Sequence, residues 1–307
     1  MVPYPTVRLF PIFIALLFAS GIPAQPAPPE DEAERAAANF VREIKLAEDD
    51  VRLFPEPPAN YREIPESGLR GTLDVLRYES GVTNTTRKAT VYLPFGYDPV
   101  HRYPVLYLLH GIGGDRHEWT RAANAHVIID NLIATGQVAP LIAVFPNGRA
   151  MADDRAPEQI FNPEAIAAFA AFEYDLLDFL IPAVESSYAT LTDPDHRALA
   201  GLSMGGGQTL NFGLTHLETF PWIGAFSAAP NTEAPEKLVP DPAAATNAVK
   251  LLYLSCGNRD NLINVSQRTH RYLKEHNVPH RWNVDDHGHD PETWGSNLYH
   301  FAQLLFR

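Results

Sequence analysis

The stretch that decides the fold is RALAGLSMGGGQTLNFGL, residues 197–214. Its first six residues form an apolar run typical of a buried strand, and the apolar residues after Ser203 recur at helical spacing. Between them lies GLSMG, residues 201–205, a G-x-S-x-G pattern. In this pattern a serine projects from a sharp strand-to-helix turn, and the glycines leave room for the turn and for close helix packing. The stretch therefore predicts a strand–turn–helix unit with Ser203 as an exposed nucleophile.

Short apolar runs separated by helical patterns extend this unit in both directions. They lack polar alternation, which is typical of strands buried on both faces in a mostly parallel sheet with helices on both sides. Two earlier segments, 71–80 and 87–94, predict an antiparallel pair of strands. The expected fold class is therefore α/β. The further predicted strands are 105–110, 141–146, 197–203, 222–229, 250–257 and 280–286, and helical spacing occurs in 122–136, 172–188, 205–220, 265–277 and, as an amphipathic closing helix, 292–307.

A serine hydroxyl needs a base to take its proton and an acid to orient that base. In the α/β-hydrolase fold these groups follow in the order Ser, acid, His, each after a later strand. Asp260 fits the acid, because it comes just after the run 250–257. Two histidines, His287 and His289, follow the last run, and spacing does not choose between them. These histidines and nearby carboxylates could instead bind a metal, but no second cluster with zinc-like spacing supports that alternative. We expect neither a metal nor a cofactor.

Acyl transfer also needs donors for a developing oxyanion. Two backbone amides normally supply them, one after the nucleophile and one in a loop after an earlier strand. Met204 offers the first amide. The loop HGIGG, residues 110–114, follows a predicted strand, and we expect Ile112 to offer the second. An ordinary glycine turn is the alternative for this loop. His110 lies at the strand end, and we expect it to be structural.

Charge and the N-terminus limit the partners and the location. The formal net charge is −13, so nucleic acid and anionic membrane surfaces, which need a basic face, are excluded as partners. The apolar run 9–19 is shorter than the roughly 20 residues that span a bilayer and has signal-peptide length. We predict a cleaved signal peptide over 1–24, and hence a secreted or periplasmic protein without a membrane partner after cleavage.

Two further regions complete the organisation of the chain. Residues 25–66 are acidic and Pro-rich, and we expect a solvated linker or clasp, in which a short helix over 31–50 is plausible. The catalytic domain is predicted to span 67–307. Cys256 is the only cysteine. It lies at the end of an apolar run, so we expect a small buried core residue rather than a nucleophile.

Besides the G-x-S-x-G pattern, several longer segments carry a family resemblance. The chain resembles the esterase D / feruloyl esterase group, carbohydrate esterase family 1, in RKATVYLPFGYDPVHRYPVLYLLHGIGGDRHEW (87–119), RALAGLSMGGGQTLNFGL (197–214), LSCGNRD (254–260) and GHDPETWGSNLYHFAQLLF (288–306). These segments keep the family's order across residues 71–307. The resemblance implies an α/β-hydrolase fold with Ser203 as nucleophile, Asp260 as acid and His289, rather than His287, as base.

The resemblance also implies a function. It indicates a secreted serine carboxylic-ester hydrolase acting on acyl esters of plant cell-wall polysaccharide, with feruloyl or acetyl esters of xylan as the first expectation. The expected partner is an acylated polysaccharide or a small ester. S-formylglutathione hydrolase, siderophore esterase and a mycolyltransferase-like acyl transferase share the motifs and are the alternatives. A non-catalytic binding protein is disfavoured, because no triad member is missing.

Tryptophans near the active-site loops suggest a binding surface for the acyl group. We predict that Trp119 and Trp294 line a pocket for an aromatic acyl group, with Trp222 as a third candidate. Each is at least as readily a core residue. The family usually has an aromatic directly after its His-Asp pair, where this chain has Pro291, so the pocket wall beside the base is expected to differ.

Overall fold

The structure is a computed structural model that describes residues 42–65 and 68–307. The predicted signal peptide, 1–24, lies outside the described residues, as does the first part of the acidic segment, up to residue 41. Among the described residues, no helix is both long and apolar enough to cross a membrane.

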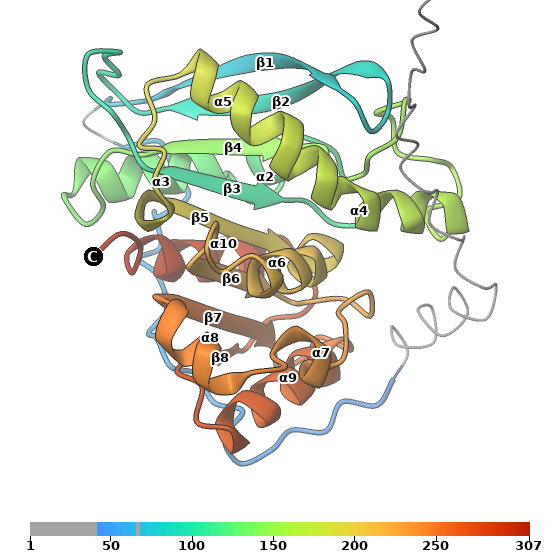
Figure 1. Cartoon of the computed structure of the whole chain (residues 1–307). Helices are drawn as coiled ribbons and strands as arrows, with labels where there is room; N and C mark the ends of the chain where they lie inside the picture. Colours follow the sequence, from blue (N-terminus) through green and yellow to red (C-terminus); the bar gives the residue numbers. More distant parts are fainter. Residues whose placement is uncertain (1–41, 66–67) are drawn as a thin grey trace, which may run out of the picture.

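One sheet organises the described part of the chain. Eight strands lie in the order β1-β2-β4-β3-β5-β6-β7-β8 across residues 42–65 and 68–307. β2 pairs antiparallel with β1 and with β4, and every other neighbouring pair is parallel. The predicted α/β class with an early antiparallel pair is confirmed (Figure 1). The strands are β1 (Thr72–Ser80), β2 (Thr85–Leu93), β3 (Val105–Leu109), β4 (Ile142–Pro146), β5 (Arg197–Leu202), β6 (Trp222–Phe226), β7 (Leu251–Gly257) and β8 (Arg281–Asp285).

Helices cover both faces of the sheet. In β3, Leu106 and Leu108 pack on the side of α3 and α10, whereas Tyr107 and Leu109 pack on the side of α4, α5 and α6. Figure 1 shows α4, α5 and α6 in front of the sheet and α3 behind it. Full burial of a large apolar side chain contributes about 1.5–3 kcal/mol, so alternate residues of one strand stabilise both layers. The helices are α2 (Glu118–Arg121), α3 (Ala125–Ala134), α4 (Pro163–Asp175), a π-helical turn (Leu176–Leu180), α5 (Ile181–Ser187), a short 3₁₀ turn (Pro194–His196), α6 (Ser203–Thr215), α7 (Pro235–Leu238), α8 (Pro242–Ala248), α9 (Ile263–Glu275) and α10 (Pro291–Ala302).

The turn between β5 and α6 has the strained geometry that the G-x-S-x-G pattern predicts. Ser203 has φ of 65°, a left-handed conformation that is uncommon for a residue with a side chain. A Cβ on Gly201 would lie 2.4 Å from the backbone oxygen of Gly205, and one on Gly205 would lie 2.5 Å from that of Leu109. Only glycine fits at these two positions, since backbone atoms cannot move aside.

Residues 42–65, here called the strap, cross the sheet edge formed by β8 and continue over α10. The amide of Val284 in β8 donates to the carbonyl of Val51, at 3.1 Å, and Trp282 Nε1 donates to Asp50 Oδ1, at 2.9 Å. Phe54 stacks on His300 of α10, with ring centroids 4.9 Å apart. These contacts favour the predicted clasp over a solvated linker. Residues 42–50 contain no helix, and the remainder of the predicted helix lies outside the described residues.

The strap changes the environment of α10. The sequence predicts an amphipathic closing helix, yet every residue from 293 to 302 is buried. One side packs on α3 and the sheet, and the other side meets strap residues, with Tyr61 edge-on to Tyr299 at 5.6 Å between ring centroids. The helix is buried all round, because the strap covers the face that would otherwise meet water.

Candidate active site

Three side chains from different loops meet in one hydrogen-bonded chain. Ser203 begins α6, Asp260 follows β7, and His289 follows β8. His289 Nε2 lies 2.9 Å from Ser203 Oγ, and His289 Nδ1 lies 2.8 Å from Asp260 Oδ2. A carboxylate only accepts, so Nδ1 carries the ring proton and Nε2 is left to accept the serine proton. Because β5, β7 and β8 are parallel, their carboxyl ends bring these groups to one edge of the sheet.

Asp260 is held as a carboxylate. Its side chain is fully buried, and burial alone would raise its pKa. The hydrogen bond from His289 opposes burial, helped by the Leu262 amide, which donates to Oδ1 at 2.8 Å, and by the Ser227 hydroxyl. Their net effect is to lower the pKa of Asp260. Ser227 has φ of 50°, and no sequence pattern singled it out as a neighbour of the acid.

The two candidate histidines have different surroundings. His287 Nε2 lies 3.8 Å from Glu56 Oε1 of the strap, and the His287 carbonyl accepts the Arg259 amide at 3.0 Å. Only His289 of the pair reaches Ser203. Asp290 caps α10 through Thr293 and also accepts the Gly288 amide at 3.0 Å, so it fixes the loop that presents His289.

The loop after β3 lies beside the nucleophile. A Cβ on Gly111 would lie 3.4 Å from Ser203 Cβ. The side chains of Ile112 and Met204 pack in one small cluster with Phe169, Ala229 and Leu262. Met204 is the second residue of α6, where helix geometry leaves backbone amides without intrahelical partners. The two predicted oxyanion donors therefore come from segments that flank Ser203.

The tryptophan prediction needs a correction. Trp119 is 1% exposed and lies in the core, with its Nε1 donating to the Leu109 carbonyl at 2.9 Å, so it presents no face to a ligand. Trp222 is buried as well, and its Nε1 donates to the Asp195 carbonyl near the amino end of β6. Trp294 lies edge-on to the His289 ring, with ring centroids 5.3 Å apart. Of the three, only Trp294 adjoins the candidate site.

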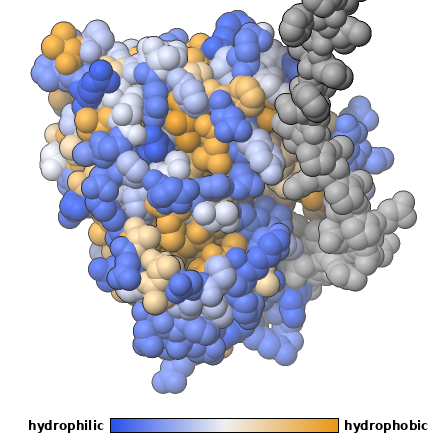
Figure 2. Space-filling view, viewed as in Figure 1, coloured by the Kyte–Doolittle hydropathy of each residue, from blue (hydrophilic) through white to orange (hydrophobic). Residues whose placement is uncertain are grey.

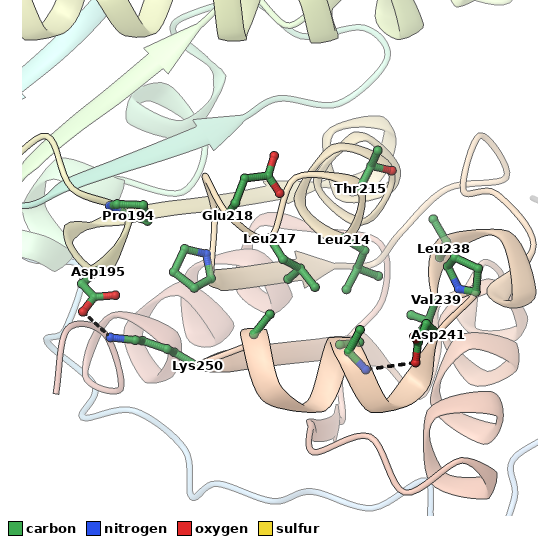
Figure 3. A pocket seen from close by; sticks show the side chains of 15 residues that line it. Pro194, Asp195, Leu214, Thr215, Leu217, Glu218, Leu238, Val239, Asp241 and Lys250 are labelled. Atoms are coloured by element: carbon green, nitrogen blue, oxygen red, sulfur yellow. Dashed lines mark hydrogen bonds and ion pairs between the residues drawn. The ribbon is translucent and has the colours of Figure 1, made fainter.

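An apolar groove lies at the end of the sheet opposite Ser203, where the parallel strands begin. It is formed by the loops that precede β5, β6 and β7, together with α8 and the end of α6, and Figure 2 shows apolar surface on this face. Figure 3 shows two of its polar groups paired: Asp195 binds Lys250 at 2.7 Å, and Asp241 caps α8. The groove lies at the amino ends of these strands, away from the carboxyl ends where Ser203, Asp260 and His289 meet.

Comparison with known proteins identifies the family of this chain. The family model named Esterase matches residues 80–301. The endo-1,4-beta-xylanase/feruloyl esterase of Xylanibacter ruminicola is 34% identical over 245 residues, which cover 77% of this chain and 32% of that protein. This chain therefore spans about a third of the length of that curated relative.

Solved structures of esterases are also similar to this chain. A carbohydrate esterase family 1 ferulic acid esterase from Anaeromyces mucronatus, in complex with ferulic acid, has a TM-score of 0.71 and is 26% identical, covering 85% of this chain and 98% of that one. The S-formylglutathione hydrolase of Staphylococcus aureus, 19% identical with a TM-score of 0.61 over 78% of this chain and 100% of that one, shares the fold. The resemblance predicted from the motifs is confirmed, and this chain belongs to the Esterase family.

Proposed function

We propose that this protein is a serine carboxylic-ester hydrolase in which Ser203, Asp260 and His289 form the catalytic triad. The observation that carries the proposal is the continuous hydrogen-bonded chain from the Ser203 hydroxyl through His289 to the buried Asp260 carboxylate. Its order in the sequence, serine, acid, histidine, is that of α/β-hydrolases. A non-catalytic binding protein would not require a serine in a strained conformation hydrogen-bonded to a histidine base.

The reaction follows from the positions of these groups. Ser203 Oγ attacks the ester carbonyl carbon, and its proton passes to His289 Nε2 as the new C–O bond forms. The amides of Met204 and Ile112 stabilise the oxyanion. His289 then gives the proton to the departing alcohol, leaving an acyl group on Ser203. A water molecule, deprotonated by His289, releases the acid and restores the serine.

The proposed substrates are feruloyl esters on a plant cell-wall polysaccharide such as xylan. Support comes from the relatives, one named as a xylanase and feruloyl esterase and one bound to ferulic acid. Acetyl esters of xylan are the second candidate. The burial of Trp119 favours them, since it removes one of the two aromatic walls predicted for a larger acyl group.

The proposed location is extracellular or periplasmic, after removal of residues 1–24. The charge pattern of those residues and the polymeric nature of the proposed substrate support this assignment. We further propose that the catalytic domain covers 67–307 and that residues 42–65 of the acidic segment fold with it, since they contribute the strap.

Matched esters test the function and the acyl preference together. The purified protein is assayed on 4-nitrophenyl ferulate and 4-nitrophenyl acetate, which share a leaving group, and on feruloylated arabinoxylan. Burial and stacking of an aromatic acyl group are worth about 1–3 kcal/mol, so we expect kcat/KM to favour ferulate about ten- to two-hundredfold. A preference for acetate would make the protein an acetyl esterase with the same mechanism. Turnover of S-formylglutathione with inactivity on both esters would overturn the cell-wall assignment.

A further inference from the structure

Three hydrogen bonds fix the backbone of Gly111, and they turn the Ile112 N–H away from the groups that bind the Gly111 carbonyl. Its carbonyl accepts from His110 Nδ1 at 2.7 Å and from the Gly114 amide at 3.1 Å. Its own amide donates to Glu118 Oε2 at 2.7 Å. The described peptide bonds include none in the cis form, so the Gly111 carbonyl and the Ile112 N–H, which belong to one peptide, point in opposite directions. The Ile112 N–H therefore points away from His110 and Gly114.

The neighbours of this peptide show which amide can serve an oxyanion. Gly111 lies against the nucleophile, because a Cβ there would lie 3.4 Å from Ser203 Cβ and 3.0 Å from Leu202 Cδ1. The Gly111 amide is already bound to Glu118. Among the described residues, the Ile112 amide donates to no other group. The loop thus offers the Ile112 amide, directly after Gly111, as an uncommitted donor beside Ser203.

His110 can hold the Gly111 carbonyl only in one tautomer. The Gly148 amide donates to His110 Nε2 at 2.9 Å, so Nε2 is an acceptor and the proton is on Nδ1, facing the Gly111 carbonyl. Asn147 Oδ1, 3.0 Å from the same Nε2, accepts the Arg149 amide instead. The ring is 1% exposed, and burial lowers the pKa of His110 despite the opposing charge of Glu118. Both observations favour a neutral ring with a defined donor.

We propose that His110 and Glu118 are positioning residues, which lock the Gly111 carbonyl and amide and thereby aim the Ile112 amide at the oxyanion. The inference rests on the proposed esterase function. It differs from a purely structural role of the two side chains, because it predicts weaker binding of the tetrahedral adduct with little change in binding of the ground state.

The test uses paired variants of the full chain. His110→Leu removes the donor, whereas His110→Asn keeps an N–H near the Nδ1 position. Glu118→Leu removes the acceptor, whereas Glu118→Gln keeps one. Leu273→Ala, on the buried face of α9, serves as a destabilised control away from the site. For each protein, kcat and KM are measured on 4-nitrophenyl acetate, and the inhibition constant is measured for phenylboronic acid, which forms a tetrahedral adduct with a reactive serine.

We expect His110→Leu and Glu118→Leu to lose about 10²- to 10³-fold in kcat, as when one oxyanion donor is lost. KM should stay within about threefold, and boronate affinity should fall in parallel with kcat. His110→Asn and Glu118→Gln should recover most of the loss, and Leu273→Ala should lower the melting temperature with kcat unchanged. If one leucine variant does not fold, the other pair decides.

Two results would overturn the inference. The first is a folded leucine variant that keeps kcat within threefold of the wild type. The second is a loss of kcat with unchanged boronate affinity, which would make the residues structural only. Failure of the esterase proposal is distinguishable, because then the wild-type protein itself would neither hydrolyse the ester nor bind the boronate.

Discussion

His287 and His289 are two positions apart, yet they contact different partners. His289 faces Ser203 and Asp260, whereas His287 faces Glu56 of the strap. We therefore expect His289→Ala to lower kcat by at least about 10⁴-fold, as loss of a triad base does in other serine hydrolases. His287→Ala should cost less than about tenfold. Steady-state kinetics on 4-nitrophenyl acetate measure both.

Ser203→Ala is the baseline for this comparison. Triad members act as a unit, so Ser203→Ala combined with His289→Ala should cost little more than either change alone. The assignment would be wrong if His287→Ala were the more damaging histidine variant, or if Ser203→Ala kept a tenth of the wild-type activity.

Also at the scale of residues, a candidate site residue was predictable from the sequence where it lies within a short motif. The G-x-S-x-G pattern predicted the strained turn at Ser203, which the structure has, and the glycine loop predicted Ile112 as an oxyanion donor. The surroundings of Trp119 in α2 were not predictable, because the Leu109 carbonyl that accepts its indole proton and the edge-on ring of Phe226 belong to two separate strands, β3 and β6. Glu118 carried no signal either, since its partner is a backbone amide seven residues earlier.

At the scale of elements, α6 approaches β3 so closely that a single methyl group decides the packing. A Cβ on Gly205 would lie 2.5 Å from the Leu109 carbonyl oxygen and 2.6 Å from that of His110. Both are backbone atoms. We expect Gly205→Ala to destabilise the protein by about 3 kcal/mol or more, at the upper end of overpacking costs, and to lower kcat through displacement of Ser203. Urea unfolding measures the first effect.

Gly213→Ala, in the same helix, is the matched control. A Cβ there would lie 3.0 Å from side-chain atoms of Ile223 rather than from backbone atoms, so a shift of a few tenths of an ångström relieves the contact, and alanine favours a helix interior by about 1 kcal/mol over glycine. We expect a change in unfolding free energy within about 1 kcal/mol. Equal destabilisation by both substitutions would contradict the steric account of Gly205.

The sheet and most helices were predictable from sequence, because apolar runs and helical spacing are local properties of the chain. The strap was not. Val51 pairs with Val284, and Phe54 stacks on His300, across more than 200 residues of sequence. Without the strap, α10 reads as a helix with one exposed face, so its full burial also depends on contacts that no local pattern records. The π-helical turn between α4 and α5 likewise interrupts what the sequence presents as one helix.

At the scale of the whole molecule, buried histidines couple stability to pH. Burial lowers the pKa of His110, His280 and His300, the last to about 4. In the unfolded chain a histidine titrates near 6.5. Between these two values the unfolded state binds more protons than the folded state, so stability rises with pH in this window. Acidification from pH 7 to pH 5 should therefore destabilise the protein.

His300 offers the clearest test of this coupling, because its ring is buried against Phe54 of the strap and the replacement His300→Phe keeps an aromatic ring there. Phenylalanine does not titrate, so the variant should lose less stability than the wild type between pH 7 and pH 5, by about 2 kcal/mol. Urea unfolding at pH 7, 6 and 5 measures both slopes. The raised pKa of Asp285, which acts in the opposite direction, is common to both proteins and cancels in the difference. Equal slopes for His300→Phe and the wild type would contradict the coupling at His300.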